Sequence, residues 1–98
     1  MNFSQLPSSV KSDILKNAYY DYMFKDSNVY FQMKADNVEF LGQEYNVIIT
    51  FGYENMNYID MMVDSCDLGE ERVIMTLMEA AKIWTDQDDG ILEMILID

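Results

Sequence analysis

The sequence predicts a single acidic α+β domain over residues 1–98. Apolar residues recur every three or four positions near the start and again after Asp67, which is typical of helices. Between them, apolar and polar residues alternate in short runs joined by short loops, as in an antiparallel β-meander. The expected order is an N-terminal helix, three to four strands, a second helix and a C-terminal strand (or short helix). Both helices are expected to pack on one sheet face.

The first helix is predicted from Pro7 to about Phe24. Proline suits the first turn of a helix, because the N–H that it lacks would have no partner there. The stripe expected to face the core repeats every four residues and comprises Leu6, Val10, Ile14, Ala18 and Tyr22.

Period-two alternation predicts the strands that follow. Residues 29–36 form the first strand, and 38–41 are either a short extra strand or a bulged continuation of it. Residues 45–53 form the strand with the strongest pattern. Residues 58–64 form a further strand after a hairpin-type loop at 54–57.

The second helix is predicted from about residue 68 to Thr85. Asp67 and Glu70 have the spacing of a capping box, in which each side chain satisfies a backbone N–H at the helix start. The stripe expected to face the core comprises Val73, Leu77, Ala81 and Trp84.

The apolar run Ile91–Ile97 is interpreted as a strand, although a short helix remains the alternative. At the edge of the sheet, such a strand would expose a long apolar edge, which natural proteins cover or pair. A homodimer through Ile91–Ile97 is then possible. The other interpretation is that this strand is buried in the centre of the sheet.

The composition excludes the common catalytic and metal sites. The chain has no histidine and one cysteine, Cys66, so a Ser-His-Asp triad is impossible and a zinc site is not expected. The run Asp86–Gly90 lacks the EF-hand spacing. We therefore expect no enzyme activity, no catalytic residues, no metal and no cofactor.

The N-terminal residues carry no basic region or apolar segment of the kind found in secretory signals. No stretch approaches the length of about 20 apolar residues that a membrane-spanning helix needs. The expected location is cytoplasmic.

The negative charge is unevenly placed along the chain. The net charge is −12, and all of the excess lies after residue 34. The carboxylates predicted to bind a partner lie on one strand face and at both ends of the second helix: Asp60, Asp64, Asp67, Glu70, Glu71, Asp86, Asp88 and Asp89.

The order of helix, three strands and helix resembles that of double-stranded RNA-binding domains as an architecture alone. Those domains use a basic helix end, which this chain lacks. Its charge also argues against direct binding to nucleic acid or to an anionic membrane.

The functional hypothesis is a small acidic non-enzymatic inhibitor, and we expect it to be encoded by a phage or other mobile element. By mimicking nucleic-acid charge, it would bind a basic nucleic-acid-binding protein such as a nuclease, a restriction enzyme or a CRISPR-type effector. In size and acidity it resembles anti-restriction and anti-CRISPR proteins.

The alternative is an adaptor or immunity-type interaction domain that uses the C-terminal strand and exposed side chains. Acidity that serves solubility alone is also open. The interface candidates of the alternative are Tyr20, Tyr30, Met56 and Met62.

Overall fold

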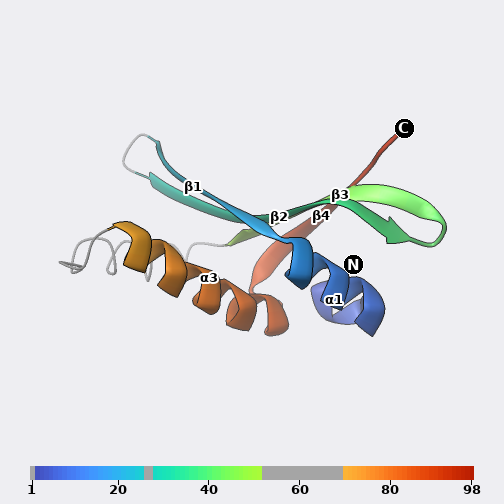
Figure 1. The fold of residues 1–98 in the computed structure, drawn as a ribbon, viewed down its shortest axis with the longest axis horizontal. Coiled ribbons are helices and arrows are strands. Elements are labelled where there is room, and N and C mark those ends of the chain that lie inside the picture. The colour runs from blue at the N-terminus through green and yellow to red at the C-terminus, as the bar shows by residue number, and fades with distance from the viewer. Residues whose placement is uncertain (1, 26–27, 52–69) are drawn as a thin grey trace.

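The computed structural model describes residues 2–25, 28–51 and 70–98. Its four strands form one antiparallel sheet in the order β1-β2-β3-β4. Both α-helices lie on the same side of this sheet (Figure 1). The structure thus confirms the α+β class, whereas the predicted loop 54–57 and strand 58–64 lie outside the described residues. The elements are η1 (Phe3–Gln5), α1 (Ser8–Asn17), β1 (Tyr19–Lys25), β2 (Asn28–Phe40), β3 (Gln43–Phe51), α3 (Glu70–Asp86) and β4 (Gly90–Leu96).

The first helix is shorter than the sequence predicted. α1 ends at Asn17, whose side-chain amide donates to the carbonyl oxygen of Asp13 at 3.0 Å. The next residues form β1, which pairs with β2 over seven consecutive positions. The prediction of a helix to Phe24 was wrong because aromatic residues favour a pleated sheet, and the pairing with β2 outweighs the helical spacing.

β2 is one long strand interrupted by a β-bulge. Its pairing with β3 shifts by one residue between Ala35 and Val38. Asn37 lies in this bulge with a φ of 56°, in the left-handed region that asparagine tolerates. The extra residue reverses the alternation, so Val38 stays on the buried face with Ala35. Of the two alternatives for residues 38–41, the bulged continuation is therefore the right one.

The core lies between the sheet and the helices and is centred on aromatic rings. Phe31 of β2 stacks on Phe51 of β3, with ring centroids 5.5 Å apart. Trp84 of α3 contacts both rings, at 5.2 Å from Phe51 and 6.5 Å from Phe31. Leu77 and Ala81 are fully buried on the same helix, as the predicted stripe required. Around this centre, α1 packs against β2, and α3 packs against η1 and β3.

The C-terminal run forms strand β4, which pairs antiparallel with β3. It begins at Gly90, where an added Cβ would lie 2.5 Å from Ile49 Cγ2, so only glycine fits this close approach. Among the described residues β4 pairs with no second strand and lies at the sheet edge. Central burial of this run is therefore not what the described sheet shows, since β3 is the strand with which β4 pairs there.

Candidate functional site

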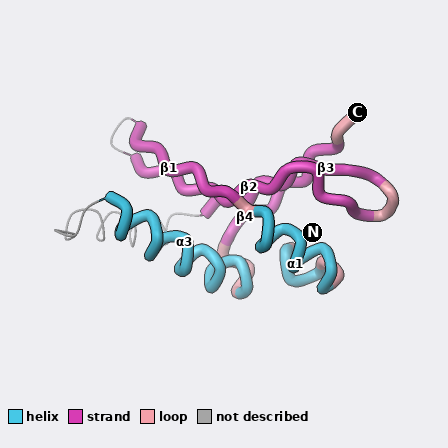
Figure 2. The backbone as a smooth tube through the Cα atoms, in the orientation of Figure 1, coloured by secondary structure: helices cyan, strands magenta, loops and turns pink. Residues whose placement is uncertain are grey.

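The sheet has one face that none of the described helices covers. Both helices lie on the opposite side, as the tube in Figure 2 shows. Because side chains alternate along a strand, the residues between the buried ones point to this uncovered side, which we call the open face. The open face comprises Tyr19, Asp21, Gln32, Lys34, Asp36, Glu39, Glu44, Asn46, Ile48, Thr50, Ile91, Glu93 and Ile95.

Carboxylates dominate the charge of the open face. Among the residues named above for this face, the lysine is Lys34, which donates a hydrogen bond to Asp21, and this bond raises the pKa of Lys34. The pair is therefore neutral as a unit. Glu39 and Glu44 lie directly opposite each other on β2 and β3, an arrangement in which like charges repel. The carboxylates that this lysine does not neutralise are Asp36, Glu39, Glu44 and Glu93.

Tyr19 adds an exposed aromatic ring beside these carboxylates. Its side chain is 46% exposed, and its hydroxyl donates to the Asp36 carboxylate at 3.3 Å. Partial desolvation and the negative charge of Asp36 raise the pKa of Tyr19, so the phenol remains a neutral donor at physiological pH. A tyrosine with one apolar ring face and one polar end is a common contact residue in protein interfaces.

An apolar strip borders the acidic part of the open face. Ile91 and Ile95 of β4 are 64% and 48% exposed, and Ile48 of β3 lies beside Glu93 of β4. Exposed isoleucines on a sheet face favour contact with another protein surface. The open face therefore combines a negative field with an apolar edge.

The predicted acidic cluster at the end of α3 is only partly free to bind a partner. Asp86 and Asp89 are exposed. Asp88 instead accepts a hydrogen bond from the Ser4 backbone N–H at 3.0 Å, which ties the end of α3 to η1. Hydrogen bonding to Ser4, through its side chain and its backbone N–H, lowers the pKa of Asp88. This carboxylate thus has a structural role in addition to its charge.

The remaining predicted contact residues are dispersed or lie outside the described part. Glu70 and Glu71 open α3, about 24 Å from Asp86 along the helix at 1.5 Å per residue. Tyr20 was expected to be exposed, but it is half-buried and stacks on Phe31 at 5.7 Å. It faces the core because it belongs to a strand, where it alternates with Tyr19. Tyr30 lies in β2, and the candidates outside the described residues are Met56, Asp60, Met62, Asp64 and Asp67.

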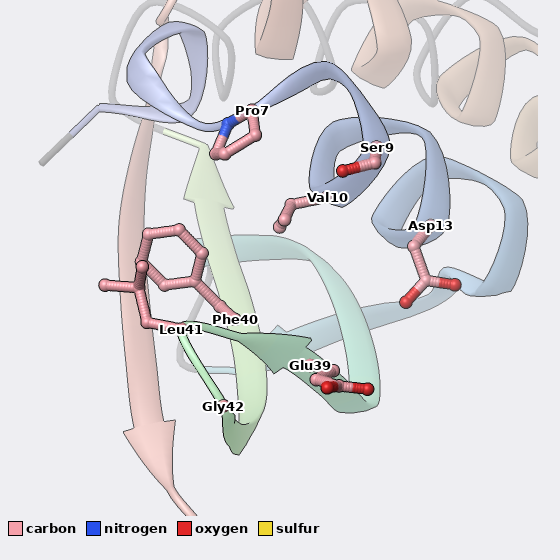
Figure 3. A pocket seen from close by; sticks show the side chains of 8 residues that line it. All are labelled: Pro7, Ser9, Val10, Asp13, Glu39, Phe40, Leu41 and Gly42. Carbon is pink, nitrogen blue, oxygen red and sulfur yellow. The ribbon is translucent and has the colours of Figure 1, made fainter.

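A hollow of about 520 Å³ lies between α1 and the β2–β3 turn. We call it the hairpin hollow. Figure 3 shows Asp13 and Glu39 on one side of it and Phe40 and Leu41 on the other. A second hollow, of about 300 Å³, lies beyond Phe40 and is lined by Phe40, Tyr45, Leu92 and Met94. The residues that complete the lining of the hairpin hollow are Pro7, Ser9, Val10 and Gly42.

Within residues 2–25, 28–51 and 70–98, no cluster of Cys, Asp or Glu has an arrangement that could hold a metal ion. None of the described helices is long and apolar enough to cross a membrane. Comparison with models of known protein families, with curated proteins and with solved structures finds no match. The residues themselves must therefore carry any functional argument.

The sequence reasoning missed the carboxylates of the open face and the hairpin hollow. For the first, Glu44 gave a signal, because it shares the polar phase of its strand with Asn46 and Thr50, and Glu93 is the one charged residue of the apolar run Ile91–Ile97. The bulge hid Asp36 and Glu39, since it reverses that phase in the middle of β2. The hollow had no signal, because α1 and the β2–β3 turn meet only through tertiary packing.

Proposed function

We propose that this chain is a small non-enzymatic inhibitor that binds a basic nucleic-acid-handling protein in place of nucleic acid. The observation that carries the proposal is the open face, where Lys34 is paired with Asp21 and four further carboxylates form no ion pair with the side chains that the structure describes. A basic groove that normally holds phosphates would meet a negative surface with an apolar border.

The spacing of the charge supports this proposal. The molecule extends 46 Å along its longest axis and carries a net charge of −12. This is about one charge per 4 Å, close to the 3.4 Å per charge of one nucleic-acid strand and sparser than the 1.7 Å of a duplex. Averaged over the whole chain, the charge is therefore comparable with that of one nucleic-acid strand.

The chemistry of binding would be electrostatic steering followed by apolar contact. A negative field raises the association rate with a basic partner, and salt screens that field. The isoleucines of β4 would add contact that salt does not weaken. The proposed complex should therefore lose affinity steeply with salt and be displaced by an oligonucleotide.

An affinity pull-down with the full chain, at about 50 mM and about 200 mM salt, tests the proposal. We expect nucleic-acid-binding proteins at low salt, with recovery that falls at high salt or when single-stranded DNA or RNA is added. A double variant, Glu44→Lys and Glu93→Lys, should reduce recovery strongly. Glu79→Lys, on the exposed side of α3, is the control for each of the single variants Glu44→Lys and Glu93→Lys, because all three change the net charge equally. Recovery of only proteins without nucleic-acid function, at both salt concentrations, would contradict the proposal.

The edge position of β4 favours one second candidate, an adaptor or immunity-type interaction domain. β4 is apolar on both faces, as a central strand usually is, yet it pairs only with β3 in the described sheet. A strand added along this edge, from a partner or from a second copy of the chain, would cover it. Light scattering on the full chain tests for a homodimer, and Ile95→Lys should dissociate it. A salt-insensitive complex would favour this candidate over the inhibitor.

A further inference from the structure

The turn between β2 and β3 contains a leucine in a conformation that leucine disfavours. Leu41 has a φ of 53° and Gly42 a φ of 78°, so both residues of the turn are left-handed. Two-residue turns of this kind favour asparagine followed by glycine, because glycine has no Cβ and asparagine tolerates the left-handed region better than other residues with a Cβ. Gly42 fits its position, whereas Leu41 does not.

The packing of the described residues does not compensate for this strain. Leu41 is 83% exposed, the highest value among the exposed large apolar side chains of the described residues. Asparagine at this position would relieve the strain and remove an apolar side chain from water. A strained, exposed apolar residue therefore points to a role outside the fold.

Leu41 stands at the rim of the hairpin hollow, which is apolar on one side and acidic on the other. The apolar side consists of Pro7, Phe40 and Leu41, and the acidic side of Asp13 and Glu39 (Figure 3). The second hollow, on the other side of Phe40, extends the apolar side.

The two carboxylates of the hollow are placed to receive a cation. The Asn17 amide donates to Asp13 Oδ1 at 2.8 Å, which orients that carboxylate. Glu39 faces Glu44 across the strand pair, so a cation beside Glu39 would relieve their repulsion. Neither Asp13 nor Glu39 forms an ion pair with a cation of the described residues.

We propose that the hairpin hollow binds a basic segment of the protein partner. An apolar side chain of that segment packs on Leu41 and Phe40, and a neighbouring lysine or arginine contacts Asp13 and Glu39. The inference rests on the proposed function, because it takes the partner to be the basic protein inferred above. The hairpin hollow adds one specific contact site, whereas the open face supplies the negative electrostatic potential that attracts the partner.

The negative charge of the hairpin hollow favours a basic segment over other ligands. The carboxylates repel phosphate, so nucleic acid and anionic lipid do not fit. The hollow is open to solvent, which suits a side chain carried by a polypeptide. A segment with an apolar and a cationic side chain close together matches its two sides.

The test uses a fluorescent peptide of alternating arginine and leucine as the probe. Control peptides replace every leucine by glycine, or every arginine by glutamine. Fluorescence anisotropy with the full chain should show the tightest binding for the arginine–leucine peptide. Amide chemical shifts should move at Ser9, Leu41 and Gly42, which border the hollow.

Leu41→Asn is the decisive variant, because it keeps the turn and removes the apolar anchor. We expect it to unfold at the same or a higher temperature and to bind the probe about tenfold more weakly. Glu39→Gln should weaken binding at low salt. The matched controls are Ile83→Asn and Glu79→Gln, on the exposed side of α3, which should change the affinity by less than about twofold.

The outcomes separate this inference from the proposed function. The docking site would be overturned if Leu41→Asn bound the peptide as tightly as the wild type does, or if Ile83→Asn lost as much affinity as Leu41→Asn. In either case, salt-dependent binding of basic proteins would still support the inhibitor. Failure of all basic peptides and all basic proteins to bind at low salt would overturn both.

Discussion

Strands β2 and β3 form two pairs of aromatic residues, and the two pairs differ in how deeply they are buried. Phe31 and Phe51 are each 1% exposed, and Trp84 of α3 packs against both rings. Phe40 and Tyr45, further along the same strands, are only half-buried, with ring centroids 6.4 Å apart. We call the location of the first pair the sealed end and that of the second pair the hairpin end.

The comparison shows that the burial of an aromatic pair depends on whether a helix covers it. At the sealed end, a third ring from α3 fills the space above the sheet. At the hairpin end, two hollows remain beside Phe40. Aromatic residues are therefore fully buried at one end and only partly covered at the other.

The largest effect is expected from truncation at the sealed end. Phe31→Ala removes a fully buried ring that Tyr20, Phe51 and Trp84 contact. It should lower the free energy of unfolding by about 3–5 kcal/mol, measured by urea denaturation. Phe40→Ala should cost less than half as much. Equal losses would mean that the two ends are equally important to stability.

A smaller effect is expected from an added methyl group at the start of β4. The Cβ of Gly90→Ala would overlap Ile49 Cγ2 and crowd the Phe51 ring at the sealed end. Overpacking of this kind costs about 1–3 kcal/mol, measurable by the same denaturation. Gly42→Ala at the hairpin end has open space and is the control, because any loss there reports backbone strain alone. A neutral Gly90→Ala would contradict the tight packing.

Tyr20→Phe should leave the sealed end intact and raise stability slightly. The Tyr20 hydroxyl is buried and has no hydrogen-bond partner among the described residues, and burial raises its pKa. Removal of an unsatisfied hydroxyl should add about 1 kcal/mol to the free energy of unfolding. A clear loss of stability would show that this hydroxyl has a partner in solution.

The smallest effect concerns pH and the link between α3 and η1. The pKa of Asp88 is lowered in the folded chain, so this carboxylate stabilises the fold above its ordinary pKa of about 3.9. That contribution is lost as the pH falls through the lower, folded-state pKa. Thermal unfolding between about pH 5 and pH 2 should therefore differ between the wild type and Asp88→Ala, and the difference should shrink with acid.

Asp88→Asn is the matched control, since asparagine also tolerates the φ of 57° at this position. It should retain an acceptor for Ser4 and lose only the charge. A difference between wild type and Asp88→Ala that stayed constant with pH would exclude the charge of Asp88 as its cause.

Most of the fold was predictable from residue patterns. The alternation that places Val47, Ile49 and Phe51 inward is local, and so is the four-residue spacing of Leu77 and Ala81. The failure at β1 has a clear cause. Its tyrosines also fit a helical spacing, and only the pairing with β2 distinguishes the two.

The candidate site was less predictable than the fold. The acidity of the chain after residue 34 was evident, and it led to the carboxylates at the ends of the second helix. The open face was not recognised, because an uncovered face depends on where the helices pack. The hydrogen bond of Asp88 to Ser4 joins residues 84 positions apart, which no local pattern contains.

The sequence by itself determined the α+β class, the strand character of the C-terminal run and the excess of negative charge, because composition and periodicity are local properties. Tertiary structure alone decided that β4 lies at the edge of the described sheet, that both helices cover one face, and that Leu41 stands beside an open hollow. These features arise from packing between segments distant in sequence, where the free energy of burial and strand pairing outweighs local preference.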